Sequence, residues 1–219
     1  MALRSYEQYC PIAIALDVLG DRWTLLVIRE LLLGAKRFTD LQRALRGISP
    51  NLLSDRLRDL EEAGLVAKQE LEPPAARVVY HLTDEGQAAR DVMGSLARFG
   101  TRHLPKPSES QNVRPAMAVH ATLTPFLDRE AAANVSDHYR LVVDGHSFDL
   151  AVTADGVAEA DPTTPPDLVL ECDAALLVAA RQGDANLGEA VADGRLQIAG
   201  TRAAFRRFLS VFSLKRSAR

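Results

Sequence analysis

Cysteine is scarce in this chain: Cys10 and Cys172 lie far apart in the sequence, without the spacing of metal ligands. This favours two reduced thiols over a structural disulfide and predicts no zinc site. The N-terminus has no signal-peptide pattern, and no apolar run approaches the ~20 residues that span a bilayer. We therefore expect a cytoplasmic protein without a membrane partner.

A large excess of one charge is also missing. The formal net charge is −3, which excludes a uniformly basic surface for nucleic acid but not a local basic patch. Residues 36–58 form such a patch, because six basic residues there stand against two acidic ones. The basic residues are Lys36, Arg37, Arg43, Arg46, Arg56 and Arg58.

The residue sets of common catalytic sites are absent. His120, His138 and His146 have no carboxylate or cysteine partner at a suitable spacing, and no Ser or Cys lies in a nucleophile motif. We expect these histidines to be isolated surface residues. The sequence thus predicts a protein that is not an enzyme and that holds no metal or cofactor.

The most informative segment is an amphipathic helix at about residues 49–63. Ser49 and Pro50 suit its start, and Gly64 suits its end. Its apolar face consists of Leu53, Leu57 and Leu60. Its opposite face carries side chains that can reach the hydrogen-bonding edges of bases, namely Asn51, Ser54, Asp55 and Arg58. Amphipathic helices are common, so the neighbouring elements decide its role.

Two helices are predicted at the start of the chain. The first, residues 11–19, is short and has one apolar stripe, formed by Ile12, Leu16 and Leu19. The second, residues 22–33, is a buried helix that Asp21 caps and Trp23 anchors in the core.

A third short helix is predicted between Phe38 and Gly47. It is followed by a tight turn and by the helix at 49–63. Together they predict a helix-turn-helix, in which the second helix enters the major groove of DNA and the first crosses the phosphates.

Residues 65–71 and 78–82 have the composition of strands, and the segment 72–76 between them contains two prolines. They predict a hairpin, or wing, on which Lys68 and Arg77 are placed to contact phosphate or the minor groove. For Lys68, a solvated position on a charged hairpin is an equal alternative.

Thr83 caps a longer helix that ends near Gly100. Because the winged unit already closes its own core, we expect this helix to serve in dimerisation. Its apolar stripe consists of Ala88, Val92, Leu96 and Phe99.

The motifs within about residues 9–100 resemble, in order and spacing, those of the HxlR family of bacterial winged-helix transcription regulators. They are Cys10-Pro11, Gly20 to Trp23-Thr24 with Leu25-Leu26, Arg37-Phe38, Ile48-Ser49-Pro50, Leu53, Arg56-Leu57, Leu60-Glu61, Gly64-Leu65-Val66, Arg77 to Tyr80, and Leu82-Thr83 to Gly86. The resemblance implies a homodimer on a near-palindromic double-stranded operator. Some members sense oxidants through a cysteine that corresponds to Cys10, which gives a redox hypothesis for this residue.

We expect Arg58 to contact a base edge, with Asp55 as the alternative partner that could hold it, and Arg37, Arg43 and Arg77 to contact phosphates. The full predicted DNA-binding set is Lys36, Arg37, Arg43, Arg46, Ser49, Asn51, Ser54, Arg56, Arg58, Lys68 and Arg77.

The fold class predicted for the whole chain is α+β, with a DNA-binding and dimerisation domain at 1–104, a linker at 105–113 and a second domain at 114–219. In the second domain, strands are expected on both sides of Asp144-Gly145, a strong hairpin signal. Further strands and three helices follow, the last with a phenylalanine stripe.

Residues 186–200 and the apolar helix after them resemble the closing part of a sterol-carrier-protein-like domain, over about residues 116–213. That resemblance implies a sheet and helices around an apolar tunnel. The residues expected to line a pocket are Phe126, Phe148, Phe205, Phe208 and Phe212, although plain core positions are the commoner role of such side chains.

The leading hypothesis is a dimeric, sequence-specific DNA-binding repressor or activator. Its second domain would sense an apolar effector or buttress the dimer. Two alternatives are kept: a carrier of apolar, lipid-like ligands, and a regulator that senses oxidants through Cys10.

Overall fold

The computed structural model describes residues 5–71, 77–103 and 113–214, and the chain divides into two compact units, residues 1–93 and 94–219. Each unit is considered by itself. The predicted linker, 105–113, falls almost wholly outside the described residues, so the predicted domain boundaries stay a prediction. Within the described residues, no helix combines the length and apolar character needed to cross a membrane.

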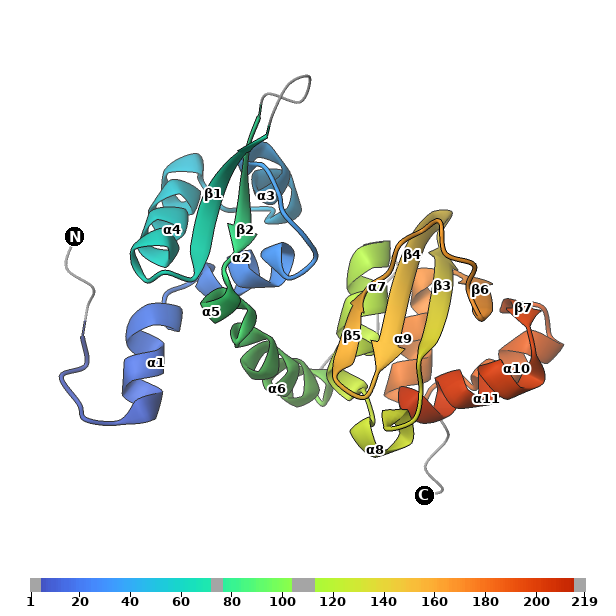
Figure 1. The fold of residues 1–219 in the computed structure, drawn as a ribbon. Helices are drawn as coiled ribbons and strands as arrows, with labels where there is room; N and C mark the ends of the chain where they lie inside the picture. Colours follow the sequence, from blue (N-terminus) through green and yellow to red (C-terminus); the bar gives the residue numbers. More distant parts are fainter. Residues whose placement is uncertain (1–4, 72–76, 104–112, 215–219) are drawn as a thin grey trace. The chain divides into compact units, whose positions relative to one another are not determined.

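The first unit contains the predicted winged helix-turn-helix (Figure 1). The third and fourth helices form the helix-turn-helix, and an antiparallel two-stranded sheet forms the wing. The elements are α1 Pro11–Leu19, α2 Thr24–Leu31, α3 Phe38–Ala44, α4 Pro50–Glu62, β1 Val66–Leu71, β2 Arg77–Leu82, α5 Asp84–Gln87 and α6 Ala89–Thr101, of which α6 continues into the second unit.

The helix α4 forms where the sequence predicts it. The Ser49 hydroxyl accepts a hydrogen bond from the Leu52 N–H at 3.3 Å, and Gly64 ends the helical segment with a φ of 72°. The apolar face is buried in the core of the unit, with Leu53, Leu57 and Leu60 at most 1% exposed. Burial of one leucine contributes about 1.5–3 kcal/mol, so this face fixes which side of α4 meets solvent.

The helix α2 is shorter than predicted, and its predicted cap is wrong. It begins at Thr24 because Trp23 has a left-handed backbone, with a φ of 81°. Asp21 does not cap the helix, since its carboxylate pairs with Arg56. Trp23 is half-buried and packs against the core, as expected of an anchor.

The single long helix predicted after Thr83 is wrong in one respect: the structure divides it into α5 and α6. The Thr83 hydroxyl caps α5 by accepting from the Gly86 N–H at 3.1 Å, and it donates to the Gly64 carbonyl at 2.6 Å. Ala88 then lies in a tighter turn, in which its N–H donates to the Glu85 carbonyl. On α6, the apolar side chains of Val92, Leu96 and Phe99 are 44%, 43% and 62% exposed, so the described chain does not cover this stripe.

The second unit is built on a five-stranded sheet of order β5-β4-β3-β6-β7. Asp144 and Gly145 both have positive φ, 48° and 76°, as a two-residue hairpin turn requires. β3 and β6 run parallel, and the other pairs are antiparallel. The elements are α7 Pro115–Thr122, η1 Thr124–Phe126, α8 Arg129–Ala132, β3 Asp137–Val143, β4 His146–Thr153, β5 Gly156–Glu159, β6 Leu168–Cys172, α9 Ala174–Gln182, α10 Leu187–Ala192, β7 Gln197–Gly200 and α11 Arg202–Val211.

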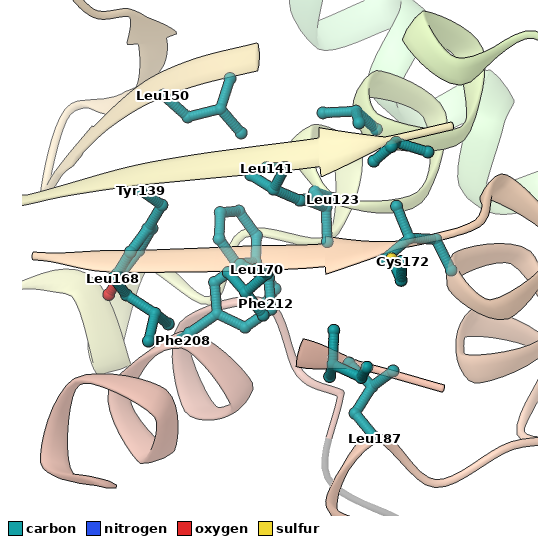
Figure 2. Close-up of a cluster of buried hydrophobic side chains, with 14 of the residues drawn as sticks. Leu123, Tyr139, Leu141, Leu150, Leu168, Leu170, Cys172, Leu187, Phe208 and Phe212 are labelled. Atoms are coloured by element: carbon teal, nitrogen blue, oxygen red, sulfur yellow. The ribbon is translucent and has the colours of Figure 1, made fainter. Parts of the chain in front are cut away.

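Two of the five phenylalanines that the sequence predicts to line a pocket are fully buried core residues, and the pocket itself stays a prediction. Phe208 and Phe212 are fully buried and pack edge-to-face against Tyr139, with ring centroids 5.2 and 6.2 Å from it (Figure 2). The three rings contact one another, as side chains of a close-packed core do. Phe148 and Phe205 are half-buried against the same core. Phe126 alone of the five lines the pocket described in the last part of the Results.

His138 is not the isolated surface residue that the sequence predicted. It is 7% exposed, and its Nε2 lies 2.8 Å from Asp149 Oδ1, which also accepts a hydrogen bond from the Nε of Arg140 at 2.8 Å. Asp149 lies directly opposite Arg140 in the β3–β4 ladder. His138 and Arg140 are two residues apart on β3, so both side chains point to the same face of the sheet as Asp149.

The close approach of Gly86, in α5, to the backbone of Leu65, after α4, gives a stability prediction. A Cβ at Gly86 would lie 2.0 Å from the backbone oxygen of Leu65, whereas a Cβ at Gly94 in α6 would meet only the end of Arg98 at 3.5 Å. We expect Gly86→Ala to lower the free energy of unfolding of the first unit by about 2–3 kcal/mol, a cost typical of overpacking. Urea unfolding followed by the fluorescence of Trp23, the sole tryptophan, measures this unit.

The control is Gly94→Ala, at the first residue of the second unit, so its unfolding is followed by far-ultraviolet circular dichroism as well. This substitution should be neutral or stabilising by up to about 1 kcal/mol, since alanine favours the helix. Equal effects of the two substitutions would contradict the close approach at Leu65.

Candidate nucleic-acid interface

The outward face of α4 carries polar side chains on a rigid helix. Asn51 and Ser54 are exposed, one turn apart, and neither has a side-chain partner among the described residues. Ser49 is exposed as well, but its hydroxyl oxygen already serves as the helix cap. Short polar groups on a helix of this kind can hydrogen-bond to base edges in the major groove.

Arg58 lies on the same helix but is held by carboxylates. Its Nη2 is 2.9 Å from Asp55 and 3.7 Å from Asp59, and its Nε is 3.9 Å from Glu62. The side chain is still 50% exposed, so the pairs are surface ion pairs of modest strength. The alternative partner expected for Arg58, Asp55, is therefore its partner in the structure of the free chain.

Arg56 does not join this exposed face. Its side chain is only 14% exposed, and its guanidinium pairs with Asp21, three residues before α2, and with Asp59 at 3.4 Å. The pair with Asp21 joins α4 to the turn before α2. Its predicted role as a DNA contact stays a prediction, which this burial weakens.

The basic residues around α3 divide into two groups. Arg43 is 82% exposed and lies 3.7 Å from Asp40. Lys36, Arg37 and Arg46 have no carboxylate within 4 Å among the residues that the structure describes. The backbone of Lys36 also pairs with Tyr80, which attaches the segment before α3 to the wing. The positive charge available for phosphates therefore lies mainly at the start of α3 and just after it.

The wing carries Lys68, whose Nζ lies 2.9 Å from Glu61 and 5.5 Å from the centroid of the Tyr80 ring. The hydrogen bond to Glu61 raises the pKa of Lys68 above its usual value, so this side chain is charged at neutral pH. Residues 72–76 at the wing tip and the side chain of Arg77 lie outside the described part of the chain. The predicted phosphate contact of Arg77 stays a prediction.

The two thiols differ in environment. Both are free, as the sequence predicted. Cys172 is 9% exposed, and burial raises the pKa of its thiol to about 12, so it stays protonated and unreactive at neutral pH. Cys10 is half-buried and directly precedes α1. In the described ranges, no cluster of three or more His, Cys, Asp or Glu residues has the arrangement of a metal site.

Comparison with known proteins agrees with this geometry. A protein-family model described as "HxlR-like helix-turn-helix" matches residues 18–108. The uncharacterized HTH-type transcriptional regulator YvaP of Bacillus subtilis (strain 168) is 35% identical over 96 residues, a match that covers 43% of this chain and 89% of YvaP. This chain belongs to the HxlR-like helix-turn-helix family.

Two further relatives match this chain over a similar number of residues. The HTH-type transcriptional regulator YodB of Bacillus subtilis (strain 168) is 37% identical over 88 residues, covering 40% of this chain and 79% of YodB. The uncharacterized regulator Rv3095 of Mycobacterium tuberculosis is 40% identical over 93 residues, covering 42% of this chain and 58% of Rv3095. These HxlR-like relatives are transcriptional regulators, which supports a DNA-binding regulator.

Sequence reasoning missed most of the carboxylates that bind the basic residues. Glu62 lies four residues after Arg58, and Asp59 lies three residues after Arg56. Helical side chains meet at these spacings, so the sequence held that signal. The partner of Arg56, Asp21, lies 35 residues away, and no local pattern marks it.

The Arg56–Asp21 pair yields a second prediction. A double-mutant cycle with Arg56→Ala and Asp21→Ala should give a coupling energy of about 1 kcal/mol or more, because the guanidinium is largely removed from water. Urea unfolding followed by Trp23 fluorescence is again the measurement. The matched control is the exposed Arg43–Asp40 pair, for which we expect about 0.2–0.5 kcal/mol. Coupling energies of equal size would show that Arg56 makes an ordinary surface ion pair.

Proposed function

We propose that this HxlR-like chain is a homodimeric regulator that binds a near-palindromic, double-stranded operator through α4. The observation that carries the proposal is the outward face of α4. There Asn51 and Ser54 are exposed and have no side-chain partner among the described residues, on a helix anchored by three buried leucines. Exposed polar groups on a helix that follows the turn of a helix-turn-helix support a role as the recognition helix in the major groove.

Arg58 is proposed to contact a guanine edge. In the free chain its guanidinium is bound to Asp55 at 2.9 Å, so binding exchanges one acceptor for another. The planar fork of the guanidinium matches the two acceptors that guanine presents in the major groove. This exchange of partners also favours specificity. At a base that offers no hydrogen-bond acceptor in the major groove, Arg58 gains nothing by leaving its carboxylate partners.

Phosphate contacts are proposed for the basic residues around α3. Lys36, Arg37 and Arg46 are favoured because the described chain gives them no carboxylate partner, and Arg43 because it is 82% exposed. Such contacts fix the position of α4 on the duplex without selecting a sequence. Lys68 and Arg77 extend the set to the wing.

The dimer is proposed to form through apolar side chains on α1 and α6. On α6 the exposed residues are Val92, Leu96 and Phe99. On and before α1 they are Tyr6, Tyr9, Ile12, Ile14 and Leu16, each at least 43% exposed. Water-exposed apolar stripes on two helices are costly in a monomer, and an isologous dimer would bury them.

The second unit is proposed to be a sterol-carrier-protein-like domain, which its five-stranded sheet and helices support. An apolar ligand between Phe208 and Phe212 is disfavoured, because these rings are packed against Tyr139. We favour support of the dimer over sensing of an apolar effector, because Phe208 and Phe212 belong to the core. Transport of an apolar, lipid-like ligand is kept as the alternative. The oxidant-sensing alternative depends on Cys10.

The test of DNA reading is Arg58→Ala on an operator selected from genomic fragments. We expect a loss of about 1–3 kcal/mol in operator binding, with little change on random DNA. Fluorescence anisotropy at several salt concentrations measures both. The control is Arg46→Ala, which should weaken binding on both DNAs and reduce the salt slope by about one. If Arg58→Ala weakened both DNAs equally, Arg58 would be a phosphate contact.

The dimer is tested by Phe99→Asp. A charge in an apolar interface should convert the protein to monomers in sedimentation velocity, because the carboxylate would lose its hydration on association. Val78→Asp on β2 is the matched control, since Val78 is also an exposed apolar residue, at 48%. A Phe99→Asp protein that sediments like the Val78→Asp protein would remove α6 from the proposed interface.

A further inference from the structure

The second unit contains a pocket of about 520 Å³ that neither the fold nor the proposed DNA binding explains. This volume lies in the range of sites for small molecules. The pocket is lined by the end of α6, by η1 and by the end of α9. The lining residues are Arg98, Thr101, Arg102, Phe126, Arg181, Gln182 and Asp184.

Arg181 is the most unusual of these residues. Its guanidinium lies 3.9 Å from the centroid of the Phe126 ring and donates to two backbone carbonyls, those of Thr122 at 2.7 Å and Phe212 at 2.6 Å. Carbonyl oxygens carry no net charge, and no carboxylate lies within 4 Å of Arg181 in the described ranges. Burial lowers the pKa of Arg181 to about 10, as expected for a cation without a counter-charge.

Two further guanidinium groups line the same pocket. Arg98 donates to the Pro125 carbonyl at 2.7 Å and to the Ser95 hydroxyl at 3.0 Å, which again are uncharged acceptors. Arg102 is exposed and directly follows α6, and no side-chain bond to a described residue is found for it. Among the lining residues, three positive charges thus stand against the single carboxylate of Asp184.

We propose that this pocket binds a small organic oxyanion, whose carboxylate or phosphate group is held by Arg102 and Arg181 while its apolar part contacts Phe126. Guanidinium groups bind such oxyanions through paired, charge-assisted hydrogen bonds. Arg181 keeps donor capacity for this purpose, because its two carbonyl bonds use two of five N–H groups. Bound anion would supply the counter-charge that the described chain does not provide.

The charged and polar side chains that line the pocket also disfavour other classes of ligand. A cation would be repelled by the excess of two positive charges, and a neutral apolar molecule would meet one aromatic ring among six polar side chains. Asp184 can accept a hydrogen bond from a hydroxyl or amine on the ligand, away from its anionic end. The proposal is independent of the proposed operator binding, since every lining residue belongs to the second unit.

The experiment is isothermal titration of the full chain with three probes that share one ring: benzoate, phenyl phosphate and benzyl alcohol. We expect at least one of the two anions to bind at least about tenfold more tightly than the neutral alcohol, since a charge-assisted hydrogen bond is worth more than a tenfold change in affinity. The stronger anion identifies the headgroup class. Equal affinity for all three probes, or no binding of either anion, would overturn the proposal.

Variants then locate the site. Arg102→Gln should weaken binding of the preferred anion by about tenfold without loss of fold, because Arg102 makes no side-chain bond to any residue in the described ranges. Arg206→Gln is the matched control: it removes another exposed arginine, on α11, that does not line the pocket. Equal affinities of the two variants would show that the anion binds elsewhere and would overturn the assignment of this pocket. Circular dichroism of both variants verifies the fold.

Discussion

The burial of one face of α4 is the constraint on which the DNA-binding unit depends. Leu53, Leu57 and Leu60 are at most 1% exposed, and together they are worth several kcal/mol. Their position determines the rotation of the helix, and hence which side chains meet solvent. Asn51 and Ser54 are available to DNA because the leucines on the opposite face are not.

Carboxylates then moderate the charge of that surface. Counted by sequence, residues 36–58 carry an excess of four positive charges, yet Arg43, Arg56 and Arg58 each lie within 4 Å of a carboxylate. The burial of Arg56 makes its pair part of the fold, whereas the exposure of Arg58 leaves its pair open to exchange. Burial, more than charge, therefore separates structural arginines from those free to bind.

The helix α6 belongs to both units, because the chain passes from the first unit to the second within it. Its first residue, Ala89, is buried in the core of the DNA-binding unit, and its last turn contributes Arg98 and Thr101 to the oxyanion pocket. The second core is different in kind, with edge-to-face rings packed under a sheet. Arg181 is a half-buried cation there, bound to backbone carbonyls, whereas Arg195 and Arg207 form surface ion pairs.

Sequence alone determined the helix-turn-helix, the caps of α4 and the Asp144-Gly145 hairpin, because periodicity, capping and turn chemistry act over a few residues. It also indicated that Arg58 has a carboxylate within reach. Only the tertiary structure decided that Arg56 pairs with Asp21, that His138 is buried beside Asp149, and that Phe208 and Phe212 fill the core. These outcomes depend on packing between segments far apart in the chain, where no local pattern records which side chains will meet.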